Sequence, residues 1–194
     1  MTNMFARSIA SLALAAIALP ALAQNAAPQA PASPFSAENM SVNEMVGDWS
    51  VRCFRVASIA PCDVMQLATQ EGTNRRVMLV SIAYVPSEKN FAMQIVVPLG
   101  VVLAQGLTLG TGAAALSNVK FTRCERDGCY VESALPMATV DGLSAATGMT
   151  SISLVAYPSN EAVNLPVSLN GFKDAIAKMR AEANARATAP AAPQ

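Results

Sequence analysis

Most of this chain carries the alternation of apolar and polar residues that β-strands require. Within residues 46–169, segments such as residues 49–53 and 91–97 place apolar side chains at every second position, so each strand would bury one face. Residues 77–85 are apolar at nearly every position, as in a central strand covered on both faces. Turn-forming residues separate these segments at short intervals. The pattern predicts a mainly β fold, an antiparallel β-sandwich or a partly open barrel.

The period of the apolar residues changes after Asn170, a suitable helix N-cap. Phe172, Ala175, Ile176 and Met179 fall at positions i, i+3, i+4 and i+7, which gives a helix one apolar stripe. We expect this single C-terminal α-helix to pack on the sheet. It is too short and too mixed in composition to cross a bilayer, so we do not expect an integral membrane protein.

The first 23 residues have the features of an export signal. Arg7 gives a basic start, residues 9–19 form an apolar stretch too short to span a bilayer, and Ala21-Leu22-Ala23 is a cleavage pattern. We therefore predict that the mature chain is exported.

Composition divides the predicted mature chain into three parts. Residues 24–41 form an Ala/Pro-rich linker and residues 187–194 a tail, and we expect both to be disordered. Between them, residues 42–186 are long enough for one β domain with its C-terminal helix and a real core.

The four cysteines, Cys53, Cys62, Cys124 and Cys129, are an even set in a chain predicted to enter an oxidising compartment. Three pairings are open, and we favour the local one, Cys53 with Cys62 and Cys124 with Cys129. Zinc thiolate sites usually have two to four residues between paired cysteines, whereas Cys53 and Cys62 have eight. We therefore expect disulfides, with no metal and no cofactor.

The second cysteine pair flanks an Asp-Gly turn, which indicates a hairpin of residues 119–124 and 129–135. Simple register across this hairpin would place Phe121 opposite Glu132. Because an aromatic and a carboxylate are discordant on one face, we expect a bulge or a longer loop there.

The charge composition excludes several classes of function. The chain has 13 basic and 13 acidic residues and no histidine, and removing Arg7 with the leader leaves 12 basic residues against 13 acidic ones. A net charge of −1 gives no electrostatic footprint for nucleic acid. Without histidine, imidazole acid–base catalysis and histidine-ligated zinc are excluded. The pairs Arg75-Arg76 and Arg123 with Arg126 indicate solvated loop ends.

Two segments come close to known catalytic motifs. Ser117 and Lys120 fit S-x-x-K, but the companion motifs of penicillin-recognising enzymes are absent. Residues 142–146 miss the nucleophile-elbow pattern by one residue and indicate a loop. We assign no catalytic residue, and an envelope hydrolase that uses carboxylates or the Ser117/Lys120 pair stays the alternative.

Residues 98–109 are rich in large aliphatic side chains and carry no charge. One strand can hide only alternate side chains in its own core, so some of these need a second cover, either the C-terminal helix or another molecule. We therefore predict a candidate interface for partner binding or self-association, made of Leu99, Val101, Val102, Leu103 and Leu107.

Several ordered motifs resemble those of the invasion-associated locus B family of bacterial envelope proteins, over about residues 42–179. They are GDWSVRC at residues 47–53, PLGVVL at 98–103 with GL at 106–107, the cysteines at 124 and 129, and VSLNGF at 167–172.

The resemblance implies an exported, disulfide-containing domain from a Gram-negative bacterium, located in the periplasm, with surface association or secretion as alternatives. A few pathogenic members of the family are linked with the invasion of host cells, and the family brings no established catalytic residues. The expected function is a noncatalytic binding or structural role, with an envelope or host protein as the unidentified partner.

Overall fold

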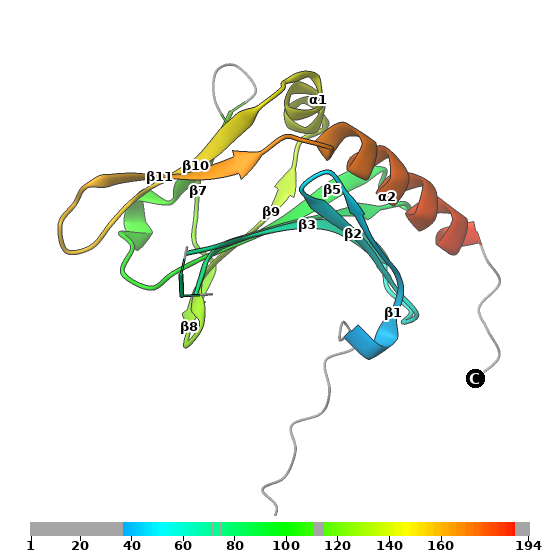
Figure 1. The fold of residues 1–194 in the computed structure, drawn as a ribbon, viewed down its shortest axis with the longest axis horizontal. Coiled ribbons are helices and arrows are strands. Elements are labelled where there is room, and N and C mark those ends of the chain that lie inside the picture. The colour runs from blue at the N-terminus through cyan, green and yellow to red at the C-terminus, as the bar shows by residue number, and fades with distance from the viewer. Residues whose placement is uncertain (1–36, 71, 74, 111–114, 189–194) are drawn as a thin grey trace, which may run out of the picture. The chain divides into compact units, whose positions relative to one another are not determined.

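The computed structural model describes residues 37–70, 72–73, 75–110 and 115–188. The predicted leader, residues 24–36 of the predicted linker and residues 189–194 lie outside these ranges. The described strands form two antiparallel sheets, and the helices α1 (Met137–Ala145) and α2 (Phe172–Thr188) lie on one side of the larger sheet (Figure 1).

The larger sheet has seven strands in the order β1-β2-β3-β4-β5-β9-β8. Neighbouring strands are antiparallel throughout, and the first five follow one another as simple hairpins. The strands are β1 (Met40–Val46), β2 (Trp49–Phe54), β3 (Cys62–Thr69), β4 (Arg76–Val85), β5 (Asn90–Val97), β8 (Arg123–Glu125) and β9 (Gly128–Leu135).

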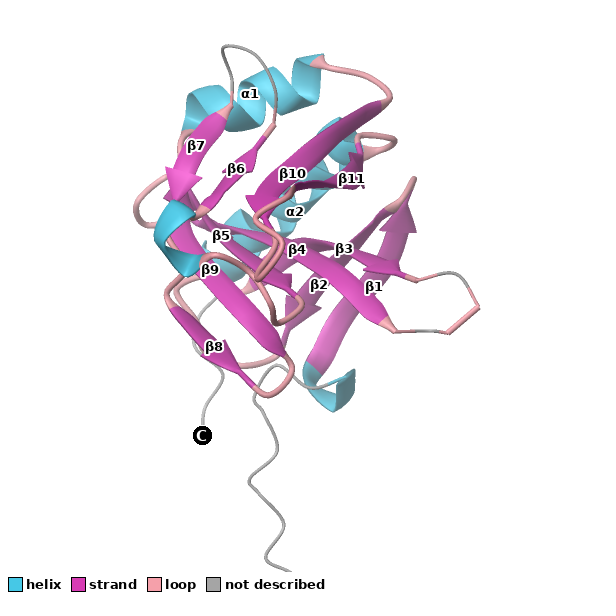
Figure 2. Ribbon diagram, turned by 90° about the vertical axis from the view of Figure 1, so that its left-hand side faces the viewer, coloured by secondary structure: helices cyan, strands magenta, loops and turns pink. Residues whose placement is uncertain are grey.

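The smaller sheet has four strands in the order β11-β10-β6-β7, so β6 lies between β7 and β10 (Figure 2). Two short 3-10 turns, η1 (Ala37–Asn39) and η2 (Leu103–Gln105), precede β1 and β6. The strands are β6 (Leu107–Leu109), β7 (Leu116–Val119), β10 (Met149–Val155) and β11 (Ala162–Ser168).

These elements confirm the predicted fold class: the protein is mainly β and antiparallel and carries a C-terminal helix. The strands of the described ranges make two separate sheets and do not close into a barrel. Within the same ranges, no helix combines the length and the apolar character needed to cross a membrane.

One hydrophobic core joins both sheets and α2. The predicted stripe of α2 faces this core, because Phe172, Ala175, Ile176 and Met179 are all buried. The ring of Phe172 packs edge-on against Trp49 of β2, with 5.0 Å between the ring centroids. The helix therefore covers the β1–β4 part of the larger sheet, as its periodicity predicts.

A close approach of two backbone turns fixes where α2 begins. Gly47, between β1 and β2, has φ of 59°, and Gly171, just before α2, has φ of 77°. A Cβ on Gly47 would lie 2.4 Å from the Asn170 carbonyl oxygen, and one on Gly171 would lie 2.3 Å from that of Val46. Only glycine allows this conformation and this contact together.

Buried polar groups complete this junction. The indole nitrogen of Trp49 donates to the Ser168 carbonyl at 2.9 Å. The side-chain amide of Gln66 donates to the same carbonyl at 3.1 Å and accepts from the Ser168 backbone nitrogen at 2.9 Å. Because these bonds satisfy a buried amide and an indole, they anchor the end of β11 to β2 and β3.

The prediction that residues 77–85 are covered on both faces is wrong. In β4, Met78, Val80, Ile82 and Tyr84 are buried, whereas the residues between them are only half-buried. Both helices and the smaller sheet lie on the first face (Figure 1). We call the opposite side the open face. Residues 77, 79 and 83 on the open face are also apolar but only half-buried, so the strand is apolar on both sides although only one side is covered.

The predicted strand 119–124 is divided between the two sheets. Its first residue ends β7, which pairs with β6, whereas β8 pairs with β9. Phe121 lies between them and packs, half-buried, against the core. Arg123 lies opposite Tyr130, as the simple register predicts, but the pairing of β8 with β9 ends before Phe121. The discordant pair of Phe121 with Glu132 is therefore avoided because the chain crosses between the sheets, and the expected bulge or longer loop within one hairpin is wrong.

Residues 142–146, predicted as a loop, are mostly helical because α1 spans Met137–Ala145. Val140 and Leu143 of α1 are buried in the core, and Thr139 is buried as well. Gly142 and the absence of charged pairs along the helix weaken its sequence signal. Tertiary packing of two apolar side chains stabilises this short helix.

Candidate functional site

All four cysteines of the chain are paired in the structure. Cys53 and Cys62 lie opposite each other on β2 and β3, with 4.1 Å between their Cα atoms. Cys124 and Cys129 lie opposite each other on β8 and β9, with a Cα separation of 4.0 Å. No group of three or more candidate ligands that could hold a metal ion occurs among the described residues.

The candidate interface from the sequence is only partly accessible. Leu99 and Leu103 are 56% and 50% exposed, while Val101 and Val102 are half-buried. Leu107 is 2% exposed, because β6 is paired on both sides and faces the core. The expectation that Leu107 belongs to an interface is therefore corrected: its own chain covers it.

The structure adds Tyr157 to this surface. Tyr157 is 68% exposed and lies in the turn between β10 and β11. Its backbone nitrogen donates to the Gly100 carbonyl at 2.9 Å, and the nitrogen of Val102 donates to Val155 at 2.9 Å. These bonds hold the two segments side by side, as Figure 1 shows for η2 and the β10–β11 turn. We call the exposed side chains of Leu99, Leu103 and Tyr157 the tip patch.

Ser117 and Lys120 do not form a catalytic pair. Ser117 is exposed on β7, which is an edge strand. The ammonium of Lys120 donates to the Ala104 carbonyl at 2.9 Å and to the side-chain oxygen of Asn118 at 2.8 Å. Lys120 therefore stabilises the η2 segment beside the tip patch and is not placed to activate Ser117.

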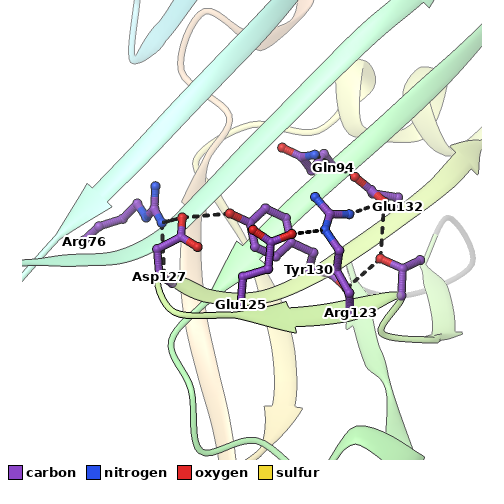
Figure 3. Close-up of polar contacts among 8 residues, drawn as sticks. Arg76, Gln94, Arg123, Glu125, Asp127, Tyr130 and Glu132 are labelled. Carbon is purple, nitrogen blue, oxygen red and sulfur yellow. Dashed lines mark hydrogen bonds and ion pairs between the residues drawn. The ribbon is translucent and has the colours of Figure 1, made fainter. Parts of the chain in front are cut away.

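A cluster of paired charges lies at the β8–β9 edge of the larger sheet (Figure 3). Arg123 donates from Nε to Glu125 at 2.6 Å and from Nη1 to Glu132 at 2.5 Å. Its guanidinium also lies over the ring of Tyr130, 4.1 Å from the centroid. Gln94 of β5 donates to the other oxygen of Glu132 at 2.9 Å.

The second half of this cluster joins β4 to the turn between β8 and β9. Arg76 donates to the carboxylate of Asp127 at 2.9 Å and to its backbone oxygen at 3.1 Å. The hydroxyl of Tyr130 donates to the same carboxylate at 2.7 Å. We refer to this set as the charged cluster: Arg76, Gln94, Arg123, Glu125, Asp127, Tyr130 and Glu132.

The hydrogen bonds of the charged cluster fix its protonation states. The bond from Arg123 lowers the pKa of Glu132. The Tyr130 hydroxyl, followed by the Arg76 guanidinium, lowers the pKa of Asp127, and the same carboxylate raises the pKa of Tyr130. Near neutral pH the carboxylates of Asp127 and Glu132 are ionised and the phenol of Tyr130 is protonated. Such groups suit electrostatic positioning, whereas a general acid–base pair needs pKa values near the working pH.

The open face also carries a smaller ion pair and a shallow depression. Asp63 accepts two hydrogen bonds from the guanidinium of Arg52 and one from Ser81 at 2.7 Å. Beside them lies an open depression of about 320 Å³. Since the carboxylate of Asp63 is already held by Arg52, Ser81 has no free base to activate it. The depression is lined by Ser81, Ala83, Ala92, Met93, Gln94, Glu132 and Ser133.

Two features of these surfaces were missed from the sequence. In the sequence, Arg76 and Arg75 form a pair of arginines that indicates the solvated end of a loop. In the structure, Arg76 contacts Asp127, which lies 51 residues further along the chain. No sequence pattern places Tyr157 beside residues 98–103. The signal for Tyr157 was the following Pro158, since a proline can force an exposed turn after a strand.

Fold and surfaces together define a class: a two-sheet antiparallel β domain with two disulfides, whose described surface carries an apolar patch and a paired-charge cluster. The family model "Invasion associated locus B (IalB) protein" matches residues 49–180, so the chain belongs to this family.

Known relatives agree with this assignment. Two proteins named invasion protein B homolog, from Brucella abortus strain 2308 and from Brucella abortus biovar 1 strain 9-941, are each 26% identical over 141 residues. Each alignment covers 73% of this chain and 80% of the relative. The crystal structure of invasion associated protein B from Bartonella henselae has the same fold, with a TM-score of 0.63 at 23% identity. That match covers 73% of this chain and 98% of the Bartonella chain.

Proposed function

We propose that this protein is an exported, noncatalytic component of the bacterial cell envelope that binds another protein through the tip patch. The observation that carries the proposal is the exposure of three large apolar side chains, Leu99, Leu103 and Tyr157, on two segments held together by backbone hydrogen bonds. Large apolar side chains exposed on neighbouring segments favour protein contacts, and tyrosine is enriched at interfaces.

The charged cluster supports a noncatalytic role. Two of its carboxylates, Glu125 and Glu132, share Arg123, and the pKa of Glu132 is lowered. A carboxylate pair that catalyses hydrolysis needs one member with a raised pKa to donate a proton. The Ser117/Lys120 alternative likewise lacks a contact between its two members.

The disulfides and the family support export to an oxidising compartment. We propose the periplasm as the location, with surface association or secretion as further destinations. The names of the Brucella abortus relatives motivate a role for the partner contact in host-cell invasion. The partner we propose is an envelope or host protein with an apolar contact surface, and neither nucleic acid nor the bilayer core.

Site-specific photocrosslinking in intact cells tests this function. A photoreactive amino acid is placed at Leu103, at Tyr157 or at Ile59, a control residue that is 74% exposed in the loop between β2 and β3. We expect the first two positions to yield the same discrete protein adduct and the control to yield none.

The products are identified by mass spectrometry. An adduct twice the mass of the chain would identify the partner as a second copy. Adducts that are the same at all three positions, or no adduct at either patch position, would contradict the tip patch as a binding surface.

A further inference from the structure

The two disulfides differ sharply in their access to solvent. Cys53 and Cys62 are both fully buried, between two interior strands of the larger sheet and under the core. In the second disulfide, Cys129 is 2% exposed but Cys124 is exposed. Thiol–disulfide exchange requires a thiolate to reach one of the two sulfurs, so access separates the two bonds kinetically.

The strand that carries Cys124 is also the least supported strand of the larger sheet. β8 has three residues, all exposed, and pairs with β9 on one side only. By contrast, β2 and β3 each pair on both sides. Short edge elements with few buried contacts open locally at a small fraction of the global unfolding free energy. The hairpin around Cys124 can therefore open while Cys53 and Cys62 stay enclosed.

The charged residues next to Cys124 neither hinder nor favour the attack of a thiolate on the Cys124–Cys129 disulfide. The chain neighbours of Cys124 are Arg123 and Glu125, which pair with each other at 2.6 Å. An approaching thiolate therefore meets a balanced pair, and the exposure of Cys124 decides the rate.

We propose that the Cys124–Cys129 disulfide is a thiol–disulfide exchange site of the folded protein, and that its reaction partner is a dithiol oxidoreductase of the exported compartment. The partner's thiolate attacks the Cys124 sulfur, the bond to Cys129 breaks, and Cys129 takes the electron pair and a proton. The partner's second thiol then attacks the partner sulfur of the mixed disulfide and releases Cys124 as a thiol. Two electrons pass to this protein, and the partner becomes a disulfide.

Reduction would act directly on the charged cluster. The disulfide is the covalent link that holds β8 against β9, and β8 supplies Arg123 and Glu125. The remaining links are the short three-pair ladder of β8 with β9, the bonds from Thr122 to the Tyr130 carbonyl and exposed ion pairs. Exposed ion pairs contribute little on their own. Loss of the bond should loosen Arg123 from Glu132 and Tyr130, and with it this edge of the sheet, while the core and the buried disulfide stay intact.

The first experiment uses the oxidised full-length mature protein and dithiothreitol as the dithiol, without denaturant. Thiols are blocked with N-ethylmaleimide at successive times and located by peptide mass spectrometry. We expect Cys124 and Cys129 to become labelled at least about tenfold faster than Cys53 and Cys62. Hydrogen exchange of the partly reduced protein should increase around β8 and remain unchanged in β2 and β3.

The second experiment tests the site of attack. A dithiol oxidoreductase whose resolving cysteine is replaced by serine traps the mixed disulfide. We expect the trap to form with wild type and with the Cys53→Ser/Cys62→Ser double variant, and not with Cys124→Ser/Cys129→Ser. If the Cys53→Ser/Cys62→Ser variant does not fold, peptide mapping of the wild-type adduct still identifies the trapped cysteine. Equal labelling rates for all four cysteines, reduction only after denaturation, or an adduct at Cys53 or Cys62 would overturn the proposal.

Discussion

Phe172→Ala tests whether packing of the first turn of α2 stabilises the whole domain. Phe172 is 1% exposed, and its ring meets Trp49 edge-on with 5.0 Å between centroids. Truncating a buried phenylalanine to alanine typically costs about 3–5 kcal/mol of unfolding free energy. The aromatic pair accounts for about 0.5–1.5 kcal/mol of that loss beyond burial. Phe172→Leu, which keeps most of the volume, should therefore lose much less than Phe172→Ala.

The assay is urea unfolding of the oxidised protein, followed by circular dichroism and by the fluorescence of Trp49, the single tryptophan. The midpoint should fall while the slope m stays constant, because the exposed surface of the unfolded state is unchanged. Lys173→Ala, at the exposed neighbouring position of the same helix, is the control and should change stability by less than about 0.5 kcal/mol. A loss below about 1 kcal/mol for Phe172→Ala would refute the reasoning.

Three further predictions concern other sites. The hydroxyl of Thr150 is buried without a hydrogen-bond partner, so Thr150→Val should be neutral or raise the thermal midpoint, and a loss above about 1 kcal/mol would contradict this. Because the folded-state pKa of Glu132 is lowered, its stabilising contribution is complete above its ordinary pKa of 4.5 and lost as pH falls through the folded value. Glu132→Gln should therefore be less stable than wild type at pH 7, and the difference should shrink in unfolding experiments toward pH 3. Ser117→Ala should leave partner crosslinking unchanged, and hydrolysis of a chromogenic β-lactam that disappeared in this variant would favour an enzyme instead.

Sequence periodicity predicts the helices and strands that have one face in the core and the opposite face exposed. Phe91, Met93 and Ile95 of β5 are buried in the core, whereas Ala92 and Gln94 between them lie on the open face, so the strand alternates. The stripe of α2 appears for the same reason. Each disulfide closes a short connection between adjacent antiparallel strands, so close spacing in the sequence suffices to suggest the pairing.

The remaining features depend on contacts between distant parts of the chain. No local pattern distinguishes β7 from β8, since the division arises where Phe121 packs against the core. The tip patch requires Tyr157 to meet Gly100, and the charged cluster requires Arg76 to meet Asp127. These pairings follow from sheet order, which alternation alone does not determine.

The contact of Gly47 with Gly171 joins a part of the chain that is synthesised early to one that is synthesised late. α2, the last described element to be synthesised, covers β1–β4, which are among the first. Until residues 172–188 emerge from the ribosome or from an export channel, Trp49 and its neighbours on that face have no helix over them. A chain that stops before Gly171 should therefore expose an apolar sheet surface and depend on a chaperone or be degraded. Packing of the N-terminal strands is thus completed only after residues 172–188 have been made.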